Sequence, residues 1–145
     1  MSEQITVNGH RGSLIINVSS YERPDANDPD DANWLKSDAT IKVGVFTGAF
    51  RFSLTTYDLI TFYQAFKTGL STLSGTVPFR TAESDIVLEI LFDSRGSAVI
   101  KGCFEPQESL EASLRFRFDS DQSYLAQTAF QLDAVIRRFP VKQAP

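Results

Sequence analysis

The chain has 145 residues, the length of one domain, and 42% of them are hydrophobic, so it can bury a core without disulfides. Its 18 acidic and 14 basic residues give a net charge of −4, which argues against nucleic acid as a partner. We expect no signal peptide, no membrane partner and a cytoplasmic location, because no basic leader and no apolar run of roughly 20 residues occurs.

The first half of the chain predicts antiparallel strands followed by one helix. Leu14–Tyr21 has the apolar alternation of a strand. Ala39–Val45 and Phe50–Leu54 alternate in the same way on either side of Thr47-Gly48, which predicts a β-hairpin with its turn there. A helix is expected from Thr55, with Thr55 as its cap, and its apolar stripe is Leu59, Phe62, Tyr63, Phe66, Leu70 and Leu73.

The second half repeats this plan. Strands are expected over Val77–Arg80, Ile86–Phe92, Ala98–Phe104 and Leu114–Phe118. Asp119 and Gln122 have the spacing of a capping box. The helix that follows ends at Pro140, and its apolar stripe is Leu125, Ala129, Leu132, Ile136 and Phe139.

These elements predict the α+β class, with a largely antiparallel β-sheet and two amphipathic helices packed on one face. We expect residues 1–145 to form a single domain with two β-meander-plus-helix halves, 12–75 and 76–140. The similarity of the halves has two explanations, an internal duplication or a recurring way of joining a strand to a covering helix.

The acidic segment Tyr21–Leu35 is the most distinctive feature of the chain. It contains five acidic residues and one basic residue within ten positions, so the rest of the chain is formally neutral. Its proline, aspartate and asparagine content predicts a long exposed loop. We expect Trp34 to anchor the return of the chain into the next strand.

The sequence offers no recognisable catalytic or metal centre. His10 is the only histidine and lies in a turn-like stretch, so we expect a surface residue rather than a general base. Cys103 is the only cysteine and is expected to be a small buried residue. One cysteine and one histidine far apart do not predict a zinc site, and we expect neither a cofactor nor a catalytic residue.

The acidic residues of the loop allow three interpretations. An EF-hand frame that starts at Asp25 places Pro29 at position 5 and Lys36 at position 12, so that calcium motif fails, although a looser oxygen site stays open. The loop could instead be a solvated connection or a surface that recognises a basic protein. In the last case the contact residues would be Asp25, Asp28, Asp30 and Asp31.

Several phrases together resemble the WapI-like family of bacterial immunity proteins. They cover roughly Leu14 to Pro140 and comprise Tyr21, Asp31–Leu35, Gly48–Leu54 leading into Asp58, Leu59 and Phe62, then Phe118–Leu125 and Phe139-Pro140. The resemblance implies a non-enzymatic toxin inhibitor that binds and neutralises a cognate toxin domain, for example a basic nuclease, and the acidic composition of the chain suits such a partner. It assigns no contact residues to this chain.

Two other functions stay open on the sequence. One is a small-molecule or carbohydrate-binding module, or an enzyme that uses carboxylates, which would require a deep pocket with aromatic residues and convergent acids. The other is a homo-oligomeric scaffold, since the sequence does not give the oligomeric state.

Overall fold

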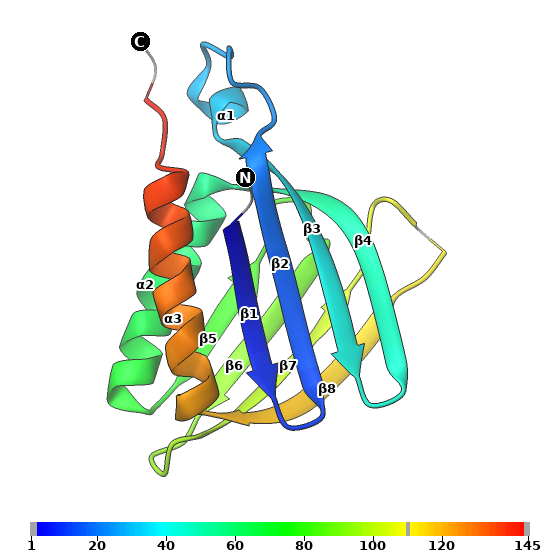
Figure 1. Cartoon of the computed structure of the whole chain (residues 1–145), viewed down its shortest axis with the longest axis vertical. Coiled ribbons are helices and arrows are strands. Elements are labelled where there is room, and N and C mark those ends of the chain that lie inside the picture. Colours follow the sequence, from blue (N-terminus) through cyan, green and yellow to red (C-terminus); the bar gives the residue numbers. More distant parts are fainter. Residues whose placement is uncertain (1–2, 110, 144–145) are drawn as a thin grey trace.

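The computed structural model describes residues 3–109 and 111–143, which form two four-stranded antiparallel sheets and three helices (Figure 1). The first sheet has the order β1-β2-β3-β4 and the second the order β5-β6-β7-β8. The strands of the first sheet are β1 (Glu3–Gly9), β2 (Gly12–Tyr21), β3 (Trp34–Val43) and β4 (Phe46–Thr55). Those of the second are β5 (Thr76–Arg80), β6 (Ile86–Phe92), β7 (Ser97–Phe104) and β8 (Leu114–Asp121).

Each sheet is a meander that leads directly into a long helix. Helix α2 (Thr56–Thr72) follows β4, and helix α3 (Gln122–Arg138) follows β8. The third helix, α1 (Pro29–Ala32), is one turn long and lies in the connection between β2 and β3. The predicted α+β class and the two meander-plus-helix units are confirmed, and a duplication as their origin stays a prediction.

The structure differs from the expected layering in where the helices lie. The strands form two sheets rather than one, and Figure 1 shows the strands of one sheet running obliquely across those of the other. Helix α3 packs along the edge strand β1, and α2 packs along the edge strand β5 and against α3. One hydrophobic cluster joins the inward side chains of both sheets and both long helices, because each meander has a single apolar face to bury.

Phenylalanine rings fill much of this shared core. Phe62 of α2 stacks on Phe79 of β5 with ring centroids 4.3 Å apart, and Phe104 packs on Phe116 at 4.8 Å. Gly69 lets α2 approach the second sheet, because a Cβ there would lie 2.7 Å from Val77. A glycine that weakens the isolated helix therefore allows its close packing.

Two local predictions are wrong. The hairpin turn lies at Gly44-Val45 rather than at Thr47-Gly48, because Val43 pairs with Phe46 and Gly44 adopts the positive φ of 59° that such a turn requires. The cap of α3 is Asp121 rather than Asp119, and its carboxylate accepts the backbone N–H groups of Ser123 and Tyr124.

The cap of α2 agrees with the sequence, whereas the first strand was not predicted. The predicted cap of α2 is confirmed: the Thr55 hydroxyl accepts the Asp58 N–H, and the Asp58 carboxylate accepts the Thr55 N–H. Strand β1, where Ile5 and Val7 are buried, was not anticipated from the sequence. It pairs with β2 and completes the first meander.

Candidate protein-recognition site

The acidic loop, residues Glu22–Asp31, stands above one end of the two sheets (Figure 1). Its base continues the β2–β3 ladder, since the Glu22 N–H donates to the Trp34 carbonyl at 2.9 Å. The Arg23 guanidinium forms an ion pair with the Asp31 carboxylate at 3.4 Å. The sequence predicted an exposed loop here, and the structure adds the short helix α1 at its end.

The four aspartates predicted to meet a partner are not equivalent. Asp25, Asp28 and Asp30 are exposed, whereas Asp31 is half-buried beside Arg23. Asp28 caps α1 by accepting the Asp30 N–H at 2.8 Å, and Pro29 is the first residue of that helix. Asp25 is therefore an exposed loop carboxylate, Asp28 and Asp30 are adjacent at α1, and Asp31 is engaged within the chain.

Asn33 fixes the end of the acidic loop, although no pattern in the sequence singles it out as an anchor. Its buried side-chain amide N–H₂ donates to the carbonyls of Pro29 and Lys142 at 2.6 and 2.9 Å. Its side-chain oxygen accepts the Thr56 hydroxyl at 2.8 Å and the Lys142 N–H at 2.7 Å. One asparagine therefore joins α1, the start of α2 and the C-terminal segment.

The C-terminal segment also packs on the strand that leads into the loop. The Tyr21 hydroxyl donates to the Pro140 carbonyl at 2.5 Å, and the Lys142 ammonium lies 4.0 Å from the centroid of the Tyr21 ring. Burial raises the pKa of the Tyr21 hydroxyl, and the charge of Arg138 opposes that shift. The same lysine donates to the Pro24 carbonyl at 3.4 Å, so residues 140–142 hold both ends of the loop.

Trp34 begins β3, as predicted, but it is half-buried and lies outside the central hydrophobic cluster. It lines an open groove of about 460 Å³ together with Glu22, Ser53 and Glu83. The Ser53 hydroxyl donates to the Glu22 carboxylate. The ring therefore lies beside carboxylates at the base of the acidic loop, a position from which it can contact a partner.

The remaining candidates do not form a reaction centre. His10 is a surface residue, as predicted, with its side chain 58% exposed and its Nε2 3.5 Å from the Asp121 carboxylate. Cys103 is half-buried on the outer face of β7, which differs from the expected core position. Within residues 3–109 and 111–143, no group of three or more histidine, cysteine and acidic side chains is arranged to hold a metal ion. Over the same residues, none of the helices is both long and apolar enough to span a bilayer.

Comparison with known proteins identifies the class of this chain. A family model of immunity proteins matches residues 4–140, nearly the whole chain. The chain therefore belongs to the Immunity protein WapI-like family, which confirms the resemblance seen in the sequence and supports an immunity role.

The other comparisons concern the fold alone. WHY1 from Arabidopsis thaliana has a similar structure, with a TM-score of 0.57 and 10% sequence identity over 96% of this chain and 91% of that one. At this identity the similarity is one of architecture. No curated protein matches the sequence significantly.

Proposed function

We propose that this protein binds a cognate toxin domain and neutralises it without catalysis, in the cytoplasm of the cell that makes the toxin. Membership of an immunity family over residues 4–140 is the observation that carries the proposal. The exposed carboxylates of the acidic loop support a basic toxin, such as a nuclease, because an enzyme that binds a polyanion presents a positive surface.

The contact region that we propose comprises the acidic loop and the tryptophan beside it. Asp25, Asp28 and Asp30 supply exposed acceptors for arginine and lysine side chains, and Asp31 adds negative charge while it orders the loop through Arg23. Trp34 is the residue type that most often contributes a large share of binding energy at an interface.

The loop is held before any partner arrives, which favours tight binding. Asn33, Tyr21 and residues 140–142 fix both of its ends through hydrogen bonds. A pre-ordered loop loses less conformational entropy on binding than a free one.

Neutralisation is tested by co-expression with a candidate toxin domain, chosen from genes adjacent to the gene for this protein. We expect cells that make the toxin domain to grow only when this protein is present, and the two purified proteins to form a stable complex. A toxin that stays fully active in the presence of excess protein would contradict the proposal.

A further inference from the structure

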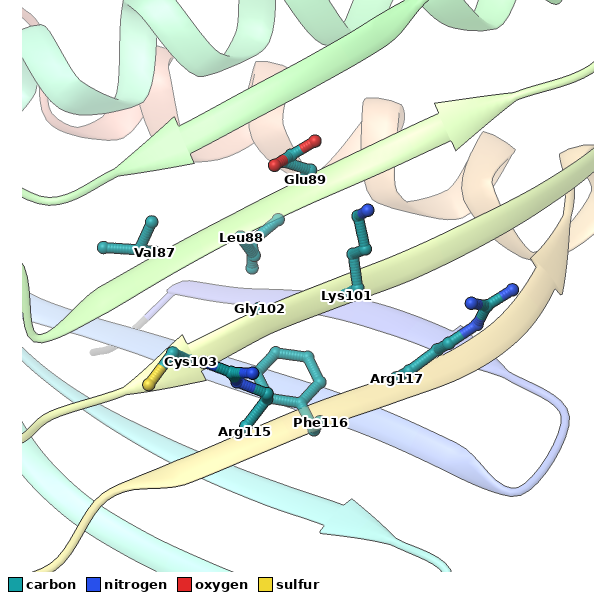
Figure 2. Close-up of a pocket in the computed structure, with 9 residues that line it drawn as sticks. All are labelled: Val87, Leu88, Glu89, Lys101, Gly102, Cys103, Arg115, Phe116 and Arg117. Carbon is teal, nitrogen blue, oxygen red and sulfur yellow. The ribbon is translucent and has the colours of Figure 1, made fainter.

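The outer face of the second sheet carries a basic groove although the chain as a whole is acidic. The groove has a volume of about 570 Å³ and lies over β6, β7 and β8 (Figure 2). Its charged side chains, all exposed, are Glu89, Lys101, Arg115 and Arg117. Three bases and one acid give this groove a positive charge, whereas the net charge of the chain is −4.

Strand register places these bases side by side. Lys101 is opposite Glu89 on one side and opposite Arg117 on the other, and Arg115 is two residues from Arg117 on the same face of β8. Figure 2 shows the lysine and the two arginines along β7 and β8. Among the described residues, none of the four charged side chains takes part in an ion pair. Their charges are therefore available to a partner.

The groove is not covered by the fold, because α2 and α3 pack along β5 and β1. Beside the bases, in the row of Arg115, lie the half-buried side chains of Cys103 and Val87, which add a small apolar surface. The ring of Phe116 points into the core. The groove therefore lacks the exposed aromatic surface on which nucleobases stack, and its chemistry suits carboxylates from a protein better than a nucleic acid.

We infer that the basic groove binds the acidic loop of a second copy of this chain. The loop protrudes from one end of the molecule and is acidic, and the groove on the outer face of the second sheet is open and basic, so their charges are complementary. Asp25, Asp28 and Asp30 supply three exposed carboxylates opposite Lys101, Arg115 and Arg117. The two surfaces differ, so the contact is heterologous and joins copies head to tail.

This self-association does not depend on the proposed toxin, although both would use the acidic loop. A toxin that occupies the loop would separate the copies, since one loop cannot contact two partners at once. The inference is therefore tested on the full-length protein alone, and its failure would leave the immunity function untouched.

Sedimentation velocity over a range of protein concentrations tests the inference. We expect concentration-dependent association at about 20 mM salt that is lost at about 500 mM, because exposed charge pairs are screened. The groove variant Lys101→Glu/Arg117→Glu and the loop variant Asp25→Asn/Asp28→Asn/Asp30→Asn should each associate at least about tenfold more weakly. The control Lys42→Glu/Lys67→Glu makes the same charge change as the groove variant elsewhere on the surface and should associate like the wild type.

Mixing the two defective variants gives the most specific result. The groove variant keeps an intact loop and the loop variant keeps an intact groove, so a head-to-tail contact predicts a 1:1 complex that cannot grow further. Circular dichroism verifies that both variants are folded, and a milder pair, Lys101→Gln/Arg117→Gln, replaces the charge reversal if it unfolds the sheet. The inference would be overturned if the wild type stayed monomeric at low salt, or if the groove variant and the control associated equally. It would also be overturned if a monomeric protein captured a single-stranded oligonucleotide through the groove.

Discussion

Two connections of this molecule are held in place by different means. The acidic loop is held at its end by Asn33, whose buried side chain makes five hydrogen bonds to three separate segments. The connection after β7 has, besides its hydrogen bonds to Asp85, an anchor at the surface, where the Glu108 carboxylate accepts the N–H of Arg51 and pairs with its guanidinium. The buried hydrogen bonds of Asn33 should stabilise the fold far more than the exposed contact between Glu108 and Arg51. Water can replace the exposed contact but not the buried one.

Removing the buried anchor should have the largest effect on stability. Asn33→Ala leaves the Thr56 hydroxyl and the Lys142 N–H without their acceptor, so we expect the free energy of unfolding to fall by about 2–3 kcal/mol. Urea unfolding measures this change. The control is Asn27→Ala, an exposed asparagine of the same loop, which should cost less than about 0.5 kcal/mol. Equal losses in the two variants would show that Asn33 is not the anchor.

The contact between Tyr21 and the C-terminal segment should matter less. Tyr21→Phe keeps the ring beneath Lys142 but removes the hydrogen bond to the Pro140 carbonyl. We expect a loss of about 0.5–1.5 kcal/mol in urea unfolding and faster proteolysis after Pro140, because one of the contacts of the segment is gone. A variant with unchanged stability and unchanged proteolysis would mean that the hydrogen bond from Tyr21 to Pro140 does not help to hold the segment.

Two substitutions of Asp28 separate its capping hydrogen bond at α1 from the negative charge of its carboxylate. Asp28→Ala removes the acceptor of the Asp30 N–H, whereas Asp28→Asn keeps an acceptor and removes the charge. We expect the alanine variant to lose about 0.5–1 kcal/mol in thermal unfolding and the asparagine variant to remain close to wild type. Equal stability of the two variants would show that α1 does not depend on its cap.

The exposed contact between Glu108 and Arg51 should have the smallest effect on stability. It is best detected by following its titration with pH. The N–H and side chain of Arg51 lower the pKa of the Glu108 carboxyl from its ordinary value of 4.5. Because the folded pKa is lowered, the stabilisation is present above 4.5 and is lost as the pH falls through the lower folded value. The NMR signal of the Arg51 amide should therefore titrate below pH 4.5 and stop titrating in Glu108→Gln. A midpoint at or above 4.5 would contradict this contact.

The sequence predicted some features of this structure and could not predict others. Alternation and helical periodicity identified most strands and both long helices, because those patterns reflect one buried face per element. The division into two sheets depends on packing between distant residues, which periodicity does not encode. The acidic loop was found from composition, whereas Asn33 was missed because its partners Pro29, Thr56, Tyr57 and Lys142 come from three segments, two of them distant in sequence.

The central claim is that the acidic loop captures a basic toxin domain. Stopped-flow binding to an inactivated toxin domain, at low and high salt, tests it most directly. We expect Asp25→Asn/Asp28→Asn/Asp30→Asn to lower the association rate by about tenfold or more at low salt and to approach wild type at high salt. The matched control Glu105→Gln/Glu111→Gln/Asp119→Asn, which removes three exposed charges elsewhere, should bind like the wild type. An association rate that is the same for the loop variant and the wild type at every salt concentration would contradict the claim.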